Sequence, residues 1–221
     1  PVCINGRRPF LQCPCLGDRS GGAAQISILQ SLSTLSNSTA GPPAASAGLD
    51  FVLKEAADYV YSVALRDGLL AAGGCDGKVR VYEAATGTLL RTLEEAADWV
   101  RAVALGDGLL AAGGSDTKVR IYEAATFRLL RTLEEAQSSV FSVALHGGLL
   151  AAGCCDGKVR VYEAATGTLL RTLQEAAGYV RSVALGDGLL AAGGDDRKVR
   201  IYQAATGRLL RTLEDAAGQI L

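Results

Sequence analysis

The sequence predicts an all-β fold built from consecutive repeats of short strands, on the basis of three observations. A tyrosine recurs every 40 residues in four units. Within each unit, short apolar runs are separated by Asp-Gly or Gly-Gly pairs, which favour tight hairpin turns because Gly adopts positive φ freely and Asp tolerates it. Apolar residues make up 49% of the 221 residues, enough for a sizeable core. The repeated tyrosines are Tyr82, Tyr122, Tyr162 and Tyr202.

Three strands are expected in the first unit, each bounded by a turn signal. Asp67-Gly68 and Asp76-Gly77 lie between apolar runs, so we expect a type I′ turn at both pairs. The first two of the three expected strands are apolar on both faces and therefore need cover on both sides, which stacked sheets provide. The expected strands are YVYSVAL at 59–65, LLAAGG at 69–74 and KVRVYEA at 78–84.

The fourth segment of each unit is ambiguous between strand and helix. Residues 89–100 place leucines and alanines on one helical face, so a repeat of three strands and a helix is the competing fold. The Thr86-Gly87 pair just before this segment indicates another hairpin turn. We therefore favour a strand at 88–93, in repeat units at about 60–99, 100–139, 140–179 and 180–219.

Residues 1–48 differ in composition from the rest of the chain. Ser, Thr, Ala, Gly and Pro dominate, and no period of 2 or 3.6 is sustained. We expect a low-complexity, disordered tail here, with at most a transient helix at 23–32, followed by the repeats over 49–221.

Charge and hydropathy exclude two classes of partner. Lys and Arg total 22 against 23 for Asp and Glu, so the chain has no basic field to hold nucleic acid. No apolar run reaches the length of a membrane span, and the start lacks the apolar region of a secretory signal. We expect no nucleic-acid or membrane partner and an intracellular location, cytoplasmic or nuclear.

The cysteine spacing predicts neither a zinc site nor a disulfide framework. The nearest pair is the CPC motif of Cys13 and Cys15, and the lone His146 does not complete a tetrahedral set. We expect reduced thiols, no metal and no cofactor. The six cysteines are at positions 3, 13, 15, 75, 154 and 155.

Each unit resembles a WD40 repeat, as VYSVALRDGLLAAGGCDGKVRVYEAATGTLLRTL of the first copy shows. A period of 40 residues fits the blades of such propellers, which run to about 40–45 residues, better than helical repeats of about 33 or 34. Helical HEAT repeats overlap this range, so the local turn signals decide between the two. The resemblance covers residues 49–221. It implies an all-β, WD40-type β-propeller with four visible blades.

The departures from the family pattern are regular. The family's Gly-His is Glu-Ala in all four units, its Ser in the second strand is Ala, and its Trp is Tyr. These changes imply that the usual hydrogen-bond network of a blade is gone. We interpret the retained aspartates as turn formers, and the recurring arginines as solvated strand partners. They are Asp76, Asp116, Asp156 and Asp196, with Arg80, Arg120, Arg160 and Arg200.

The number of blades indicates a partial propeller. Members of the resembled family usually close with about seven blades, and propellers in general with about four to eight. Residues 49–53 align with the fourth strand of a preceding unit, and 219–221 with the start of a following one. We expect a fragment or truncated product, or a homodimer that completes an eight-bladed ring, because an open arc leaves sheet faces and edges uncovered.

Positions that vary between the units are candidates for partner recognition. They flank the Val that opens each first strand, and the resemblance places them on the top face. Tyr, Trp and Arg dominate binding hot spots, although packing against the next blade is the structural alternative. The residue before each turn Asp also varies: Cys75, Ser115, Cys155, Asp195. The expected partner-binding residues are Tyr59, Tyr61, Trp99, Arg101, Phe141, Tyr179 and Arg181.

These features favour a non-catalytic protein-interaction scaffold. The chain has one His, no phosphate-binding Gly-rich loop and no nucleophile-base set, so we do not expect an enzyme. The expected ligand is a protein or peptide with an acidic or phosphorylated residue, which arginine binds through paired hydrogen bonds. The alternatives are a structural or truncated fragment with no independent function, or the propeller domain of a larger enzyme complex.

Overall fold

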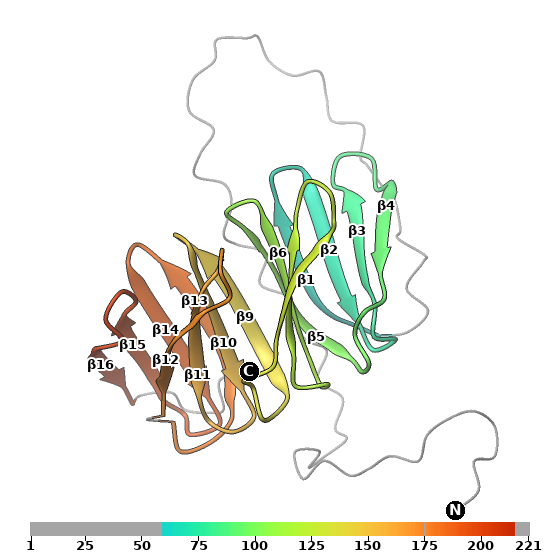
Figure 1. Cartoon of the computed structure of the whole chain (residues 1–221). Helices are drawn as coiled ribbons and strands as arrows, with labels where there is room; N and C mark the ends of the chain where they lie inside the picture. The colour runs from blue at the N-terminus through green and yellow to red at the C-terminus, as the bar shows by residue number, and fades with distance from the viewer. Residues whose placement is uncertain (1–58, 175, 215–221) are drawn as a thin grey trace, which may run out of the picture. The chain divides into compact units, whose positions relative to one another are not determined.

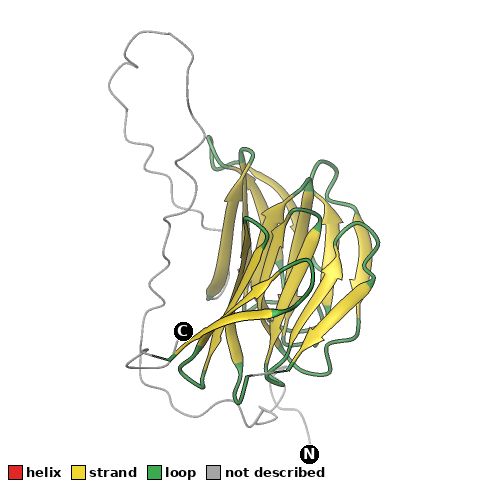
Figure 2. Cartoon of the chain, turned by 90° about the vertical axis from the view of Figure 1, so that its left-hand side faces the viewer, coloured by secondary structure: helices red, strands yellow, loops and turns green. Residues whose placement is uncertain are grey.

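The computed structural model describes residues 59–174 and 176–214, and all their regular structure is strand. Sixteen strands form four antiparallel sheets of four, which stand side by side (Figure 1, Figure 2). The all-β, four-blade prediction is confirmed, and the helical alternative for residues 89–100 is wrong. Among the described residues, no helix is long and apolar enough to cross a membrane. The predicted tail, its transient helix and the CPC motif lie outside these residues.

Each blade is a meander of four strands in chain order. Blade 1 contains β1 (Val60–Arg66), β2 (Leu69–Gly74), β3 (Val79–Glu83) and β4 (Leu89–Leu93). Blade 2 contains β5 (Val100–Gly106), β6 (Leu109–Gly114), β7 (Val119–Glu123) and β8 (Leu129–Leu133). Blade 3 contains β9 (Val140–His146), β10 (Leu149–Cys154), β11 (Val159–Glu163) and β12 (Leu169–Leu173). Blade 4 contains β13 (Val180–Gly186), β14 (Leu189–Gly194), β15 (Val199–Gln203) and β16 (Leu209–Leu213).

The two Asp-Gly turns of a unit differ from each other. Asp67 and Gly68 have φ values of 50° and 76°, as the predicted type I′ turn requires. At the second turn only Gly77 has positive φ, so the type I′ prediction is wrong there. The Asp76 carboxylate instead accepts a hydrogen bond from the Lys78 amide at 3.1 Å. This side-chain bond shapes the turn and leaves Asp76 itself in an ordinary conformation.

The blades pack through their first strands. β1 lies beside β5, β5 beside β9, and β9 beside β13. The packing is close because each blade presents a Gly to the next: a Cβ on Gly73 would lie 2.7 Å from Val100 Cγ1, and one on Gly113 would lie 2.6 Å from Val140 Cγ1. The core is therefore a series of apolar layers between successive sheets.

A buried ion pair inside each blade corrects our prediction for the arginines. Arg80, Arg120, Arg160 and Arg200 are only 4–7% exposed, not solvated. Each guanidinium lies 2.6–2.7 Å from the carboxylate of the turn Asp four residues earlier. The sequence analysis placed these arginines on strands but did not predict their burial, which depends on the pairing with an Asp of the preceding turn.

The same carboxylates also bind backbone amides. Asp116 accepts from the Ala97 amide at 3.1 Å and the Lys118 amide at 3.2 Å. At Asp76, burial acts to raise the pKa, but the hydrogen bond from Arg80, the Lys78 amide and the nearby positive charges lower it below its ordinary value. The Asp76 carboxylate therefore contributes to the free energy of unfolding at pH values above the ordinary carboxyl pKa. This contribution is lost as the pH falls through the lowered pKa. The turn Asp, the Arg and the backbone amides thus form one hydrogen-bonded network, as at Asp116.

Replacing Thr117 by Gly is expected to raise the free energy of unfolding by about 1 kcal/mol, because the left-handed conformation is costly for a residue with a Cβ. Thr117 has a φ of 67°, whereas Gly77 and Gly157 fill the same turn position in blades 1 and 3. Urea denaturation measures the change. The control Thr132→Gly, in strand β8, is expected to destabilise the protein, and a loss of stability in both variants would contradict the prediction.

Candidate binding rim

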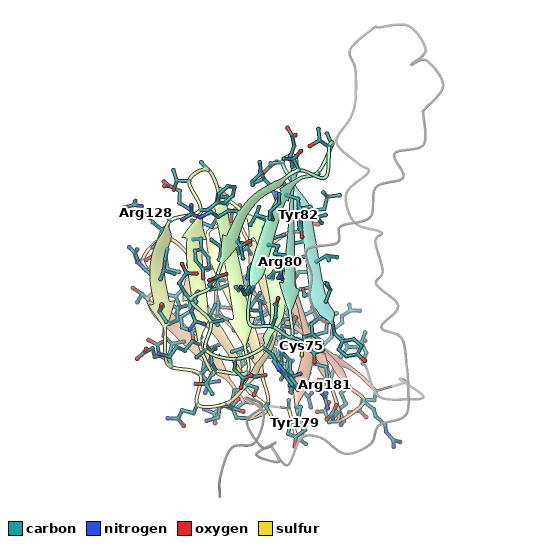
Figure 3. The ribbon with its side chains drawn as sticks, turned by 90° about the vertical axis from the view of Figure 1, so that its right-hand side faces the viewer. Cys75, Arg80, Tyr82, Arg128, Tyr179 and Arg181 are labelled. Carbon is teal, nitrogen blue, oxygen red and sulfur yellow. The ribbon has the colours of Figure 1, made fainter. Side chains whose placement is uncertain are left out.

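One end of each blade brings the varied sequence positions together. The pairing of the first two strands shifts in register at the start of β5, between Val100 and Ala102. Beside this bulge, the Ser115 amide donates to the Trp99 carbonyl oxygen at 2.9 Å. The residue before the turn Asp therefore lies next to the residues that flank the opening Val. Figure 3 shows Cys75, Tyr179 and Arg181 at this end, and Arg128 at the other.

Aromatic rings and guanidinium groups alternate along this end from blade to blade. The guanidinium carbon of Arg101 lies 5.7 Å from the ring centre of Tyr61 and 5.1 Å from those of Trp99 and Phe141. That of Arg181 lies 4.7 Å from the Phe141 ring and 5.2 Å from the Tyr179 ring. These distances are typical of cation–π contacts. We call Tyr61, Trp99, Arg101, Phe141, Tyr179 and Arg181 the rim cluster.

Six of the seven residues predicted from sequence variation thus lie in one cluster. Ring-to-ring contacts reinforce it, with centroids 5.7 Å apart for Tyr61 and Trp99 and 6.2 Å apart for Phe141 and Tyr179. Tyr59, the seventh, immediately precedes β1 and is exposed. The same contacts support the alternative that these aromatic residues serve to pack one blade against the next, since they touch residues of neighbouring blades.

Ser115 and Asp195 orient the two arginines, and sequence reasoning did not pair them with these partners. Arg101 Nε donates to Ser115 Oγ at 2.6 Å. Arg181 donates from two nitrogens to the two oxygens of Asp195, at 2.8 and 3.1 Å. The sequence contained a signal for these pairs. The two blades with Arg at this position have Ser or Asp 14 residues later, whereas the two blades with an aromatic residue there have Cys. Arg181 therefore already binds a carboxylate of its own blade.

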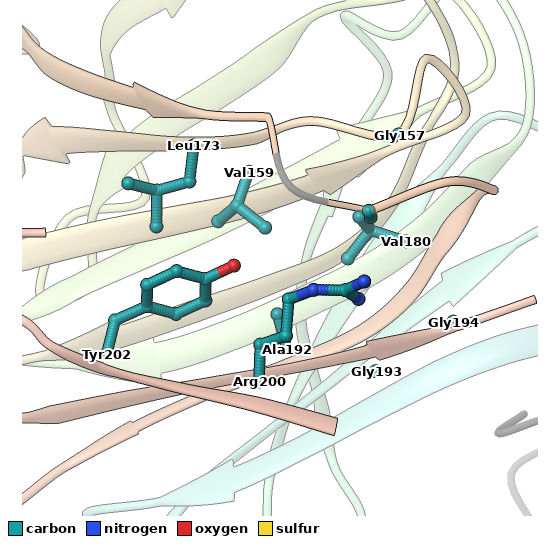
Figure 4. Close-up of a pocket in the computed structure, with 10 residues that line it drawn as sticks. Gly157, Val159, Leu173, Val180, Ala192, Gly193, Gly194, Arg200 and Tyr202 are labelled. Atoms are coloured by element: carbon teal, nitrogen blue, oxygen red, sulfur yellow. The ribbon is translucent and has the colours of Figure 1, made fainter. Parts of the chain in front are cut away.

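The described residues contain no cluster of metal ligands, and a cavity between two blades lies apart from the rim cluster. Among them, no cluster of three or more His, Cys, Asp or Glu side chains could hold a metal ion. A small cavity lies between blades 3 and 4, where Val159, Leu173 and Tyr202 meet near Arg200 (Figure 4). It is an apolar packing gap inside the fold and includes no residue of the rim cluster.

Cys154 is expected to resist alkylation in the folded protein at pH 8. Burial raises the pKa of its thiol to about 11, so almost none of it is the reactive thiolate. Cys75 and Cys155 are partly exposed, and no disulfide joins these three cysteines. Mass spectrometry after brief maleimide treatment, with a urea-unfolded sample as control, measures the difference. Labelling of Cys154 as fast as Cys155 would contradict the expectation.

Comparisons with known proteins support the WD40 resemblance. Residues 127–163 and 167–203 match the family described as "WD domain, G-beta repeat", each match running from the last strand of one blade to the third strand of the next. A comparison with curated proteins finds none that matches. Among solved structures, the chain is similar to the computationally designed Ika4 protein, with a TM-score of 0.64 and 25% identity over 69% of this chain and 95% of that chain. The resemblance and the fold class are thereby confirmed.

Proposed function

We propose that this protein is a non-catalytic scaffold that binds a partner peptide, carrying an acidic or phosphorylated residue, on the rim cluster. WD40 repeats generally mediate contacts between proteins, which supports the coarser part of this function. The finer part rests on one observation: the Arg101 guanidinium is held among three aromatic rings, of which Trp99 and Phe141 are nearest, at 5.1 Å each.

Arg101 is the better of the two arginines for holding an anion. Its bond to Ser115 uses one of the five guanidinium N–H groups, and Ser115 brings no charge of its own. A carboxylate or phosphate can accept two parallel bonds from a guanidinium, while the flanking rings offer apolar faces to neighbouring peptide side chains. At Arg181, by contrast, an incoming anion must compete with Asp195. The anionic residue is therefore assigned to Arg101, and Arg181 to a supporting role.

A peptide library displayed in phosphorylated, acidic and neutral forms tests the proposal. We expect phosphorylated or acidic peptides to be selected, and the Arg101→Ala variant to weaken the selected peptide at least about tenfold, as for a hot-spot residue. Arg101→Lys keeps the charge but loses the planar pair of donors, so it should recover only part of the affinity. Asp195→Asn should leave binding unchanged or strengthen it, because it removes a competing charge.

Arg128→Ala is the matched control, because it removes the same charge from an exposed position at the opposite end of the blade. It is expected to bind as the native chain does. Titration calorimetry measures each affinity, and far-UV circular dichroism checks that each variant folds. Selection of neutral peptides, or equal losses for Arg101→Ala and Arg128→Ala, would refute the proposed site. Pull-down with an Arg101→Ala, Arg181→Ala, Trp99→Ala variant extends the test to whole proteins.

A further inference from the structure

The four blades are of two alternating types, so the true period of the chain is two blades. Blades 1 and 3 carry an aromatic residue where blades 2 and 4 carry Arg, and a large residue where blades 2 and 4 carry Gly. The same alternation recurs at several further positions. The matched sets are Tyr61, Arg101, Phe141, Arg181; Arg66, Gly106, His146, Gly186; and Val81, Ile121, Val161, Ile201.

The alternation follows from contacts between unlike blades. Arg101 of blade 2 contacts Tyr61 of blade 1 and Phe141 of blade 3. Gly106 of blade 2 leaves room for blade 3, since a Cβ there would lie 2.8 Å from the carbonyl oxygen of Leu145. Blade 4 has the same type as blade 2. It is therefore built to be followed by a blade of the type of blades 1 and 3.

Blade 4 has no such neighbour among the described residues. A Cβ on Gly186 would meet nothing within 4 Å, although its counterpart Gly106 is tightly enclosed. On the same face, Leu213 is 48% exposed, whereas its counterpart Leu173 is 7% exposed. The uncovered face of blade 4 therefore carries the counterparts of residues that, in the preceding blades, pack against the next blade.

Blade 1 has the complementary face uncovered. Val60 is 42% exposed and its counterpart Val100 is 1% exposed; for Leu65 and its counterpart Leu145 the values are 52% and 6%. These are the side chains that meet the preceding blade at the three internal contacts. Blades 1 and 4, the outer blades of the described residues, thus carry the two halves of one interface, in the blade types that alternate correctly.

We propose that two copies of this chain associate with two-fold symmetry, blade 4 of each covering blade 1 of the other, to close a ring of eight blades. Gly186 of one copy then lies against the partner subunit's Leu65, as Gly106 lies against Leu145. Ser182 can also accept a hydrogen bond from the partner subunit's Val63 amide. Ser62 and Ser142 make this bond at 3.1 Å in the other type of junction, whereas the junction of blades 2 and 3 has Ala102 at this position. Eight is an even number, so the alternation of blade types continues unbroken around the ring. This assembly does not depend on the proposed peptide binding.

Sedimentation equilibrium on the full chain tests the ring. The native chain is expected to have twice the monomer mass of 22.8 kDa. Gly186→Glu should halve the mass without disturbing the fold, because the site is open space within one copy. The control Leu170→Glu adds the same charge to an exposed side chain of β12, and should leave the mass doubled. Circular dichroism verifies the fold of each variant.

Mixing two interface variants distinguishes the closed ring of two chains from other associations that cover blades 1 and 4. Gly186→Glu and Leu65→Lys should each be monomeric alone, because both interfaces of their dimers are damaged. A mixed dimer has one native interface, and in the other the introduced Glu and Lys face each other. The mixture should therefore regain twice the monomer mass. A native chain that is monomeric at every concentration, or that forms open-ended oligomers, would overturn the ring, and so would a mixture that stays monomeric.

Discussion

Replacing Arg120 by Ala is expected to lower the free energy of unfolding by about 3–5 kcal/mol, because it leaves a buried carboxylate without its partner. Arg120 Nη2 lies 2.7 Å from Asp116 Oδ2, and their side chains are only 7% and 6% exposed. Urea denaturation of the native and variant chains measures the loss. A midpoint close to that of the native chain would show that the ion pair does not stabilise the blade.

Two further variants isolate the cause of this loss. The double variant Asp116→Asn, Arg120→Met removes both charges and keeps an acceptor for the Lys118 amide, so it should be less destabilised than Arg120→Ala. Glu134→Gln breaks the exposed pair of Lys118 and Glu134, whose atoms are 2.6 Å apart, and should leave the midpoint unchanged. A double variant that is less stable than Arg120→Ala would mean that packing, not the unpaired charge, dominates.

Replacing Gly114 by Ala is expected to cost about 1–3 kcal/mol and to displace the indole of the rim cluster, because there is no room for the added methyl group. A Cβ at this position would lie 2.7 Å from the carbonyl oxygen of Trp99. That carbonyl is backbone and already accepts the Ser115 amide, so it cannot move aside easily. The chain contains one Trp, so intrinsic fluorescence reports the displacement directly.

The control for Gly114→Ala is Ser115→Ala. It removes the hydroxyl that accepts from Arg101 Nε but keeps the backbone bond to the Trp99 carbonyl. We expect a smaller loss of stability and a smaller change in fluorescence. Equal effects in the two variants would indicate that the Arg101 bond, and not the space around Gly114, holds Trp99 in place.

The fold could be predicted because every unit repeats the same local signals. The same pattern of turns and apolar runs occurs four times, so each copy confirms the number of strands predicted from the others. The Thr-Gly pair before residue 88 correctly favoured a strand over a helix. The strand limits differ by a residue or so from those expected, as for β1, which runs from Val60 to Arg66. The predicted type I′ geometry is found at Asp67-Gly68, but not at the second turn, where the Asp76 carboxylate accepts the Lys78 amide.

The sequence indicated which varied residues would lie near one another, but not which side chains they would contact. Comparing the units with one another located the varied residues, because scaffold contacts keep the other positions constant. The pairs Arg101 with Ser115 and Arg181 with Asp195 join positions 14 residues apart, across a hairpin with a bulge. Sequence spacing does not show which side chains such a bulge brings together. The burial of Arg80 was missed for a similar reason, since its partner Asp76 comes from the turn.

The alternation of blade types also bears on how the length of such a protein can change. Duplicating or deleting a single 40-residue unit would place two blades of the same type in succession. Two Arg blades in a row would set like charges side by side where each Arg now contacts the Tyr61 or Phe141 ring of an unlike blade, and two blades with a large residue at the Gly106 position would collide. A change of 80 residues keeps every junction between unlike blades. Viable relatives of this chain should therefore differ in length by pairs of repeats, and a gene with an odd number of repeats should carry compensating substitutions at the mismatched junction.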